Sequence, residues 1–127
     1  MKSYTNIEQS QKLAEILPIE SADMYYCYGM NIDTKIWSFD DTPTIIDADN
    51  QVDVDDIPCW SLAALLNVLP KNLDIGRPVL ATNYRGYYWV SYFDEYMKET
   101  NLISKIYNNP IDACYEMIIK LNELKML

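Results

Sequence analysis

The chain has 127 residues, half of them hydrophobic, and a formal net charge of −9 at pH 7. This length fits one domain of ordinary size, so we predict a single globular domain spanning residues 1–127. Its 11 Tyr, 3 Trp and 2 Phe exclude intrinsic disorder, and its lack of histidine excludes imidazole-based catalysis and histidine metal sites.

The first predicted element is a helix at about residues 6–17. Thr5 and Glu8 have the spacing of a capping box, in which each side chain accepts the other residue's backbone N–H. Pro18 ends the helix, because the residue before a proline is driven out of helical geometry.

Short strands and an acidic loop are predicted next. The segments 24–28, 32–39 and 42–46 contain aromatic and β-branched residues typical of strands. Residues 47–56 combine turn-forming residues with like charges, which indicates an exposed loop.

The second predicted helix covers residues 58–69. Pro58 suits a first helical turn, and the acidic Asp55 and Asp56 suit the positive end of the helix dipole. Because nearly all of its side chains are apolar, we expect this helix to lie centrally in the core.

A hairpin at about residues 78–93 and a helix at about residues 110–125 complete the predicted elements. Gly86 supplies the positive φ of the hairpin turn, and Asn109 with Pro110 forms a helix start. The fold class expected is α+β, with three helices packed with an antiparallel sheet.

The negative charge is concentrated in the first part of the chain. Residues 1–56 hold 12 acidic and 3 basic side chains, whereas residues 57–127 hold 7 of each. Binding to a phosphate backbone requires a basic surface, so we predict no direct contact with nucleic acid. A basic protein partner or a cation fits this distribution.

The aspartates of the acidic loop alternate along the chain and suggest an alternative function. Asp47, Asp49, Asp53 and Asp55 place carboxylates at every second or fourth residue, as calcium loops do. The EF-hand pattern also requires a turn glycine and a final glutamate, where this chain has Val52 and Pro58. A solvated acidic loop is therefore the favoured interpretation, with a divalent-cation or small-ligand module as the alternative.

Aromatic side chains and an arginine also gather in the predicted hairpin. Tyr84, Arg85, Tyr88 and Tyr92 form one candidate surface for a ligand or a partner protein. Alternate residues of a strand face opposite sides, so we expect the other aromatic side chains of the hairpin to belong to the core.

No combination of residues predicts catalysis. The three cysteines are far apart in the sequence, the three glycines cannot form a phosphate loop, and adjacent carboxylates do not define a cleft. We therefore predict no enzyme activity, no catalytic residue and no cofactor. No apolar segment typical of a signal peptide follows residues 1–6, and no run of apolar residues is long enough to span a membrane. We therefore expect a cytoplasmic location.

Three segments of the chain are similar to segments of other proteins: LAEILPIESADM at 13–24, IPCWSLAALLNVLP at 57–70 and NPIDACYEMIIKLNEL at 109–124. They resemble a group of uncharacterised small acidic proteins encoded in phage-like or mobile DNA of gut anaerobic bacteria. The resemblance implies an accessory role in a mobile element, and it implies no catalytic or binding residue.

The function expected from these observations is non-enzymatic and depends on protein–protein contact. A sharper form is an acidic mimic of nucleic-acid charge that occupies a basic protein. Self-association as a homodimer, through a strand edge or the tyrosine surface, is a further expectation.

Overall fold

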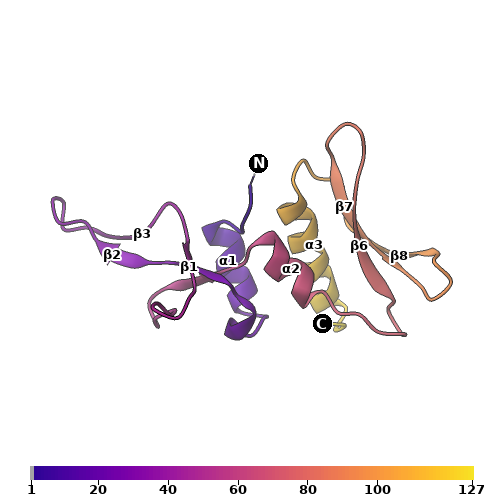
Figure 1. Cartoon of the computed structure of the whole chain (residues 1–127), viewed down its shortest axis with the longest axis horizontal. Coiled ribbons are helices and arrows are strands. Elements are labelled where there is room, and N and C mark those ends of the chain that lie inside the picture. Colours follow the sequence, from indigo (N-terminus) through magenta and orange to yellow (C-terminus); the bar gives the residue numbers. More distant parts are fainter. Residues whose placement is uncertain (1) are drawn as a thin grey trace. The chain divides into compact units, whose positions relative to one another are not determined.

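The computed structural model describes residues 2–127 and has the predicted α+β fold (Figure 1). The chain divides into two compact units. Residues 4–64 form one, called here the N-terminal unit, and residues 65–127 with the segment up to Ser3 form the other, the C-terminal unit. The boundary falls within one short helix, and the single domain over residues 1–127 stays a prediction.

The N-terminal unit contains two small antiparallel sheets beside a helix. In chain order its elements are α1 (Ile7–Ala14), the 3₁₀ turn η1 (Ile19–Ser21), β1 (Met24–Tyr26), β2 (Tyr28–Met30), β3 (Trp37–Phe39), β4 (Thr44–Ile45) and β5 (Ile57–Cys59). One sheet has the order β4-β1-β5, and α1 packs beside β5. The other sheet consists of β2 and β3 alone.

Helix α1 begins one residue later than the predicted capping box requires. The Asn6 side chain accepts the backbone N–H of Gln9 at 2.8 Å, and the Gln9 side chain accepts that of Asn6 at 3.1 Å. The predicted Thr5–Glu8 box is therefore wrong. Thr5 is fully buried, and its hydroxyl instead accepts the backbone N–H of Trp60 at 3.2 Å.

The second helix, α2 (Leu62–Val68), starts four residues after the predicted position. Residues 57–59 are the edge strand β5, in which Pro58 lies opposite Tyr25 of β1. Proline is tolerated there because an edge strand has one side without a partner strand. Ser61 caps the helix by accepting the N–H of Ala64 at 3.3 Å. The expected burial on all sides is also wrong, since Ala63 is exposed.

The C-terminal unit packs one helix against a three-stranded antiparallel sheet. Its elements are β6 (Arg77–Thr82), β7 (Tyr88–Phe93), β8 (Glu99–Ile103) and α3 (Pro110–Glu123), with strand order β6-β7-β8. Helix α3 packs on the central strand β7 (Figure 1). Its buried side is apolar and includes Ile111, Cys114, Met117, Ile118 and Leu121.

The predicted hairpin and the predicted last helix are confirmed. Strands β6 and β7 pair from Arg77–Phe93 to Thr82–Tyr88, and Gly86 has a φ of +83° in the turn. Asn109 caps α3 by accepting the N–H of Asp112 at 2.9 Å. Both features depend on neighbours in the sequence, which explains why local patterns predict them.

Candidate binding surfaces

The predicted tyrosine surface is divided by the structure. Tyr84 is 92% exposed at the hairpin tip, and the Arg85 guanidinium lies 5.7 Å from the centre of its ring. Tyr88 is half-buried. Tyr92 is fully buried, and its hydroxyl donates a hydrogen bond to the Pro70 carbonyl at 2.8 Å. Tyr92 therefore belongs to the core, and its predicted place on a binding surface is wrong.

The reason lies in which face of β7 meets the helix. Val90 and Tyr92 share one face of the strand and are fully buried, whereas Trp89 and Phe93 share the other face and are half-buried. Alternation along a strand shows which residues share a face. It does not show which face the helix covers, so the expectation that Tyr88 and Tyr92 both face outward is wrong for Tyr92.

The acidic loop is exposed, as predicted. Asp47, Asp49, Asp53 and Asp55 all face solvent, and the Asp47 carboxylate accepts the backbone N–H of Asp49 at 2.8 Å. Within residues 2–127 there is no group of three or more Asp, Glu, Cys or His side chains arranged to hold a metal ion. The four predicted cation ligands are thus not brought together.

Asp56 connects this loop to the paired strands β2 and β3. One oxygen of its carboxylate accepts the backbone N–H of Tyr28 at 3.0 Å, and the other accepts that of Asp53, also at 3.0 Å. Burial raises the pKa of the Cys27 thiol, and the charges of Asp56, Asp40 and Asp53 raise it further. Asp40, Asp53 and Asp56 therefore lie around the start of β2.

Strands β2 and β3 form a hairpin, residues 28–39, that we call the arm. Its cross-strand pairs place Tyr28 opposite Phe39 and Met30 opposite Trp37. The Tyr28 ring stacks on the Trp37 ring, with centroids 5.5 Å apart and planes 29° apart. The Tyr28 and Phe39 rings are 4.8 Å apart and tilted by 47°. The arm thus has a continuous face of aromatic and methionine side chains.

This aromatic face is largely open to solvent. The exposed fraction is 56% for Trp37, 47% for Met30 and 37% for Tyr28. An isolated two-stranded hairpin is marginally stable in water, and a contiguous exposed apolar surface is typical of an interaction site. Sequence reasoning missed this face, although large side chains alternating with Gly29 and Ser38 are its signal.

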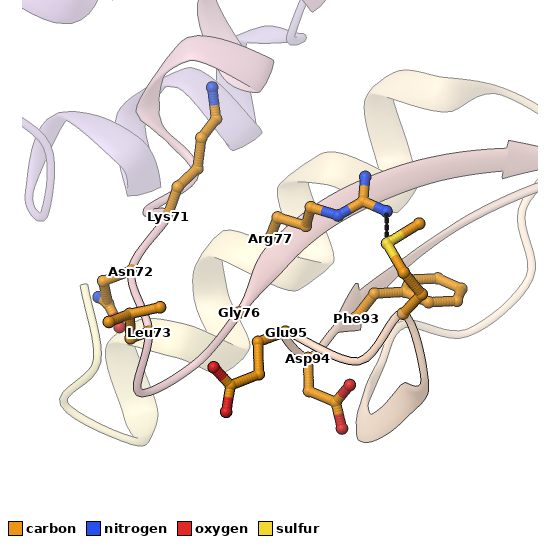
Figure 2. Close-up of a pocket in the computed structure, with 9 residues that line it drawn as sticks. Lys71, Asn72, Leu73, Gly76, Arg77, Phe93, Asp94 and Glu95 are labelled. Carbon is orange, nitrogen blue, oxygen red and sulfur yellow. Dashed lines mark hydrogen bonds between the residues drawn. The ribbon is translucent and has the colours of Figure 1, made fainter.

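A separate cavity of about 450 Å³ lies in the C-terminal unit (Figure 2). It opens between the turn at 71–76 and the turn that follows β7, and its wall includes Phe93 and Arg77. The Arg77 guanidinium donates to the Met97 sulfur at 2.8 Å. The Lys71 ammonium points to one side of the opening, and the carboxylates of Asp94 and Glu95 point to the opposite side (Figure 2). These charges do not converge on one ligand position.

The cysteine thiols inside the two units are held in their neutral form. Burial raises the pKa of Cys59, although hydrogen bonds from Thr5, Ser10 and Tyr26 partly oppose this effect. Burial also raises the pKa of Cys114 to about 12. A nucleophilic cysteine requires a lowered pKa and access for a substrate, and these two fully buried side chains have neither.

The Cys114 thiol should make the protein less stable at alkaline pH. The pKa of this thiol is 9.0 in the unfolded chain and about 12 in the folded chain. Stability is therefore unaffected below pH 9.0 and falls above it, because the unfolded chain then loses the proton more readily than the folded chain does. From about pH 8 to about pH 10 we expect a loss of about 1.4 kcal/mol in unfolding free energy from this thiol. Urea unfolding at both pH values measures it. If Cys114→Ala loses as much stability over this interval as the parent, the expectation is wrong.

Comparison of the chain with protein-family models, curated proteins and solved structures gives no match. The resemblance to small acidic proteins of mobile DNA stays a prediction. Among the helices described here, none has the length and apolar character needed to cross a membrane.

Proposed function

We propose that this protein is a non-enzymatic accessory protein that binds a basic protein partner through the arm and the acidic loop of its N-terminal unit. The observation that carries the proposal is the exposed aromatic face of the arm, which is followed in the chain by an acidic segment without Lys or Arg, residues 36–70. The apolar face supplies contact area, and the carboxylates supply charge complementarity.

The charge around the arm favours a basic partner. No Lys or Arg occurs between Lys35 and Lys71, while Asp40, Asp41 and the acidic loop lie in this interval. Because the Asp56 carboxylate bonds to the backbone of both Tyr28 and Asp53, the end of the acidic loop at residues 53–56 is held near the base of the arm. A field of one sign accelerates encounter with a partner of the opposite sign, and salt weakens this effect.

A sharper form of the proposal is that the acidic surface replaces nucleic acid on its partner. A protein surface that binds phosphates is basic and attracts any ordered array of carboxylates. DNA added to the complex would then displace the protein in a salt-dependent manner, whereas a partner that binds no nucleic acid would be unaffected.

The test compares two charge-neutralised variants in affinity capture from a bacterial lysate. One variant changes Asp47, Asp49, Asp53 and Asp55 to Asn, which preserves the side-chain acceptor of each position. The control neutralises four carboxylates of the C-terminal unit: Asp74, Glu95, Glu99 and Glu123.

We expect the parent and the control to retain a basic protein at low salt and to release it at high salt. The loop variant should retain several-fold less, because each lost charge weakens the attraction. If no basic protein is enriched, or if its retention is independent of salt, the proposed function is wrong.

A further inference from the structure

The aromatic face of the arm is suited to recognise cations as well as apolar groups. The face of an indole or phenol ring carries partial negative charge and attracts a cation that lies over it. Trp37 is more than half exposed, and the Tyr28 ring stacks against it with ring centroids 5.5 Å apart. The indole is therefore an accessible platform for a cation.

The charges next to this platform are mainly negative. Between residues 28 and 41 the chain carries Asp33, Asp40 and Asp41 against the single basic Lys35. All four side chains are exposed. A cation placed on the Trp37 ring therefore lies in a field that favours it, and carboxylates are available for further basic groups on the same segment.

We propose that the arm selects arginine in its partner, an inference that rests on the proposed function. A guanidinium stacks on the ring of Trp37, and neighbouring arginines of the same segment pair with Asp40 and Asp41. Arginine suits such a site better than lysine does. Its guanidinium is planar, stacks on aromatic faces, is less strongly hydrated and forms two parallel hydrogen bonds to a carboxylate.

The experiment titrates the protein with two synthetic peptides of equal length and charge, in which Gly and Ser separate either arginines or lysines. Calorimetry measures the affinities, and the indole N–H signal of Trp37 in NMR spectra reports where each peptide binds. We expect the arginine peptide to bind about 2- to 5-fold more tightly, which is the gain typical of a cation over an exposed ring.

Three variants separate ring chemistry from apolar area. Trp37→Leu keeps apolar area without a π face, and it should remove the preference for arginine. Trp37→Phe should retain part of that preference. Tyr84→Leu removes a ring of the C-terminal unit that is even more exposed than Trp37, and it should change nothing. Circular dichroism shows whether each variant is folded, and we expect Trp37 to tolerate substitution because over half of its surface is exposed.

The outcomes distinguish the two proposals. Equal binding of both peptides, or an unchanged preference in Trp37→Leu, overturns the selection of arginine while a general attraction to basic partners stands. If neither peptide binds at low salt, both proposals are overturned. A preference for arginine that depends on Trp37 supports both.

Discussion

Replacing Gly76 by alanine is expected to destabilise the protein by about 2 kcal/mol or more, because two costs coincide at this position. Gly76 has a φ of +89°, where residues with a Cβ are strained. A Cβ added to it would also lie 2.2 Å from the Phe93 carbonyl oxygen, which belongs to the backbone and cannot move aside. Gly76 directly precedes β6, where the turn from Asn72 closes through two backbone hydrogen bonds.

The other two glycines provide matched controls for this prediction. Gly86 also has a positive φ, +83°, but nothing lies within 4 Å of an added Cβ, so Gly86→Ala should cost about 1 kcal/mol from backbone strain alone. Gly29 has neither constraint, and Gly29→Ala should be close to neutral. Urea unfolding of the three variants should therefore rank Gly76 first, Gly86 second and Gly29 last. Equal losses at Gly76 and Gly86 would contradict the role assigned to the Phe93 carbonyl.

Replacing Thr5 by valine is expected to cost about 3 kcal/mol, although the two side chains have nearly the same shape. The Thr5 hydroxyl lies 2.7 Å from the Ser10 hydroxyl and accepts the backbone N–H of Trp60 at 3.2 Å. Both Thr5 and Ser10 are fully buried. Valine would leave the Trp60 N–H without its acceptor and the Ser10 hydroxyl without its shortest hydrogen bond, away from water.

Two substitutions test the cause of that loss. Thr5→Ser keeps the hydroxyl and removes only a methyl group, so it should cost about 1 kcal/mol. Thr82→Val removes an exposed hydroxyl and should change stability by less than about 0.5 kcal/mol. Thermal unfolding followed by circular dichroism compares the three. If Thr5→Val is no worse than Thr82→Val, the buried network does not stabilise the N-terminal unit.

The same network explains why the start of α1 was predicted one residue early. Thr5 and Asn6 are both good N-cap residues, and each has a suitable side chain three positions later, Glu8 or Gln9. The choice depends on Trp60, which is 55 residues away and requires the Thr5 hydroxyl. Local patterns contain both possibilities, and a distant contact selects between them.

In the candidate site, too, local patterns predict some features and contacts between distant residues decide the others. The sequence contains the acidic loop and its lack of basic neighbours, and the loop is exposed as predicted. The aromatic face of the arm was missed, because it requires the pairing of Tyr28 with Phe39 and of Met30 with Trp37. Tyr92 was expected on an exposed surface and is buried, because only the position of α3 decides which face of β7 is covered.

By itself the sequence determined the α+β class, the charge distribution, the hairpin at Gly86 and the helix that Asn109 caps. These features depend on composition or on residues close together in the chain, where capping, turn geometry and periodicity act directly. Only the tertiary structure decided that residues 57–59 form a strand, that Tyr92 is buried and that the arm exposes its aromatic face. Each of these depends on contacts between residues distant in the chain, whose free energy exceeds local preference.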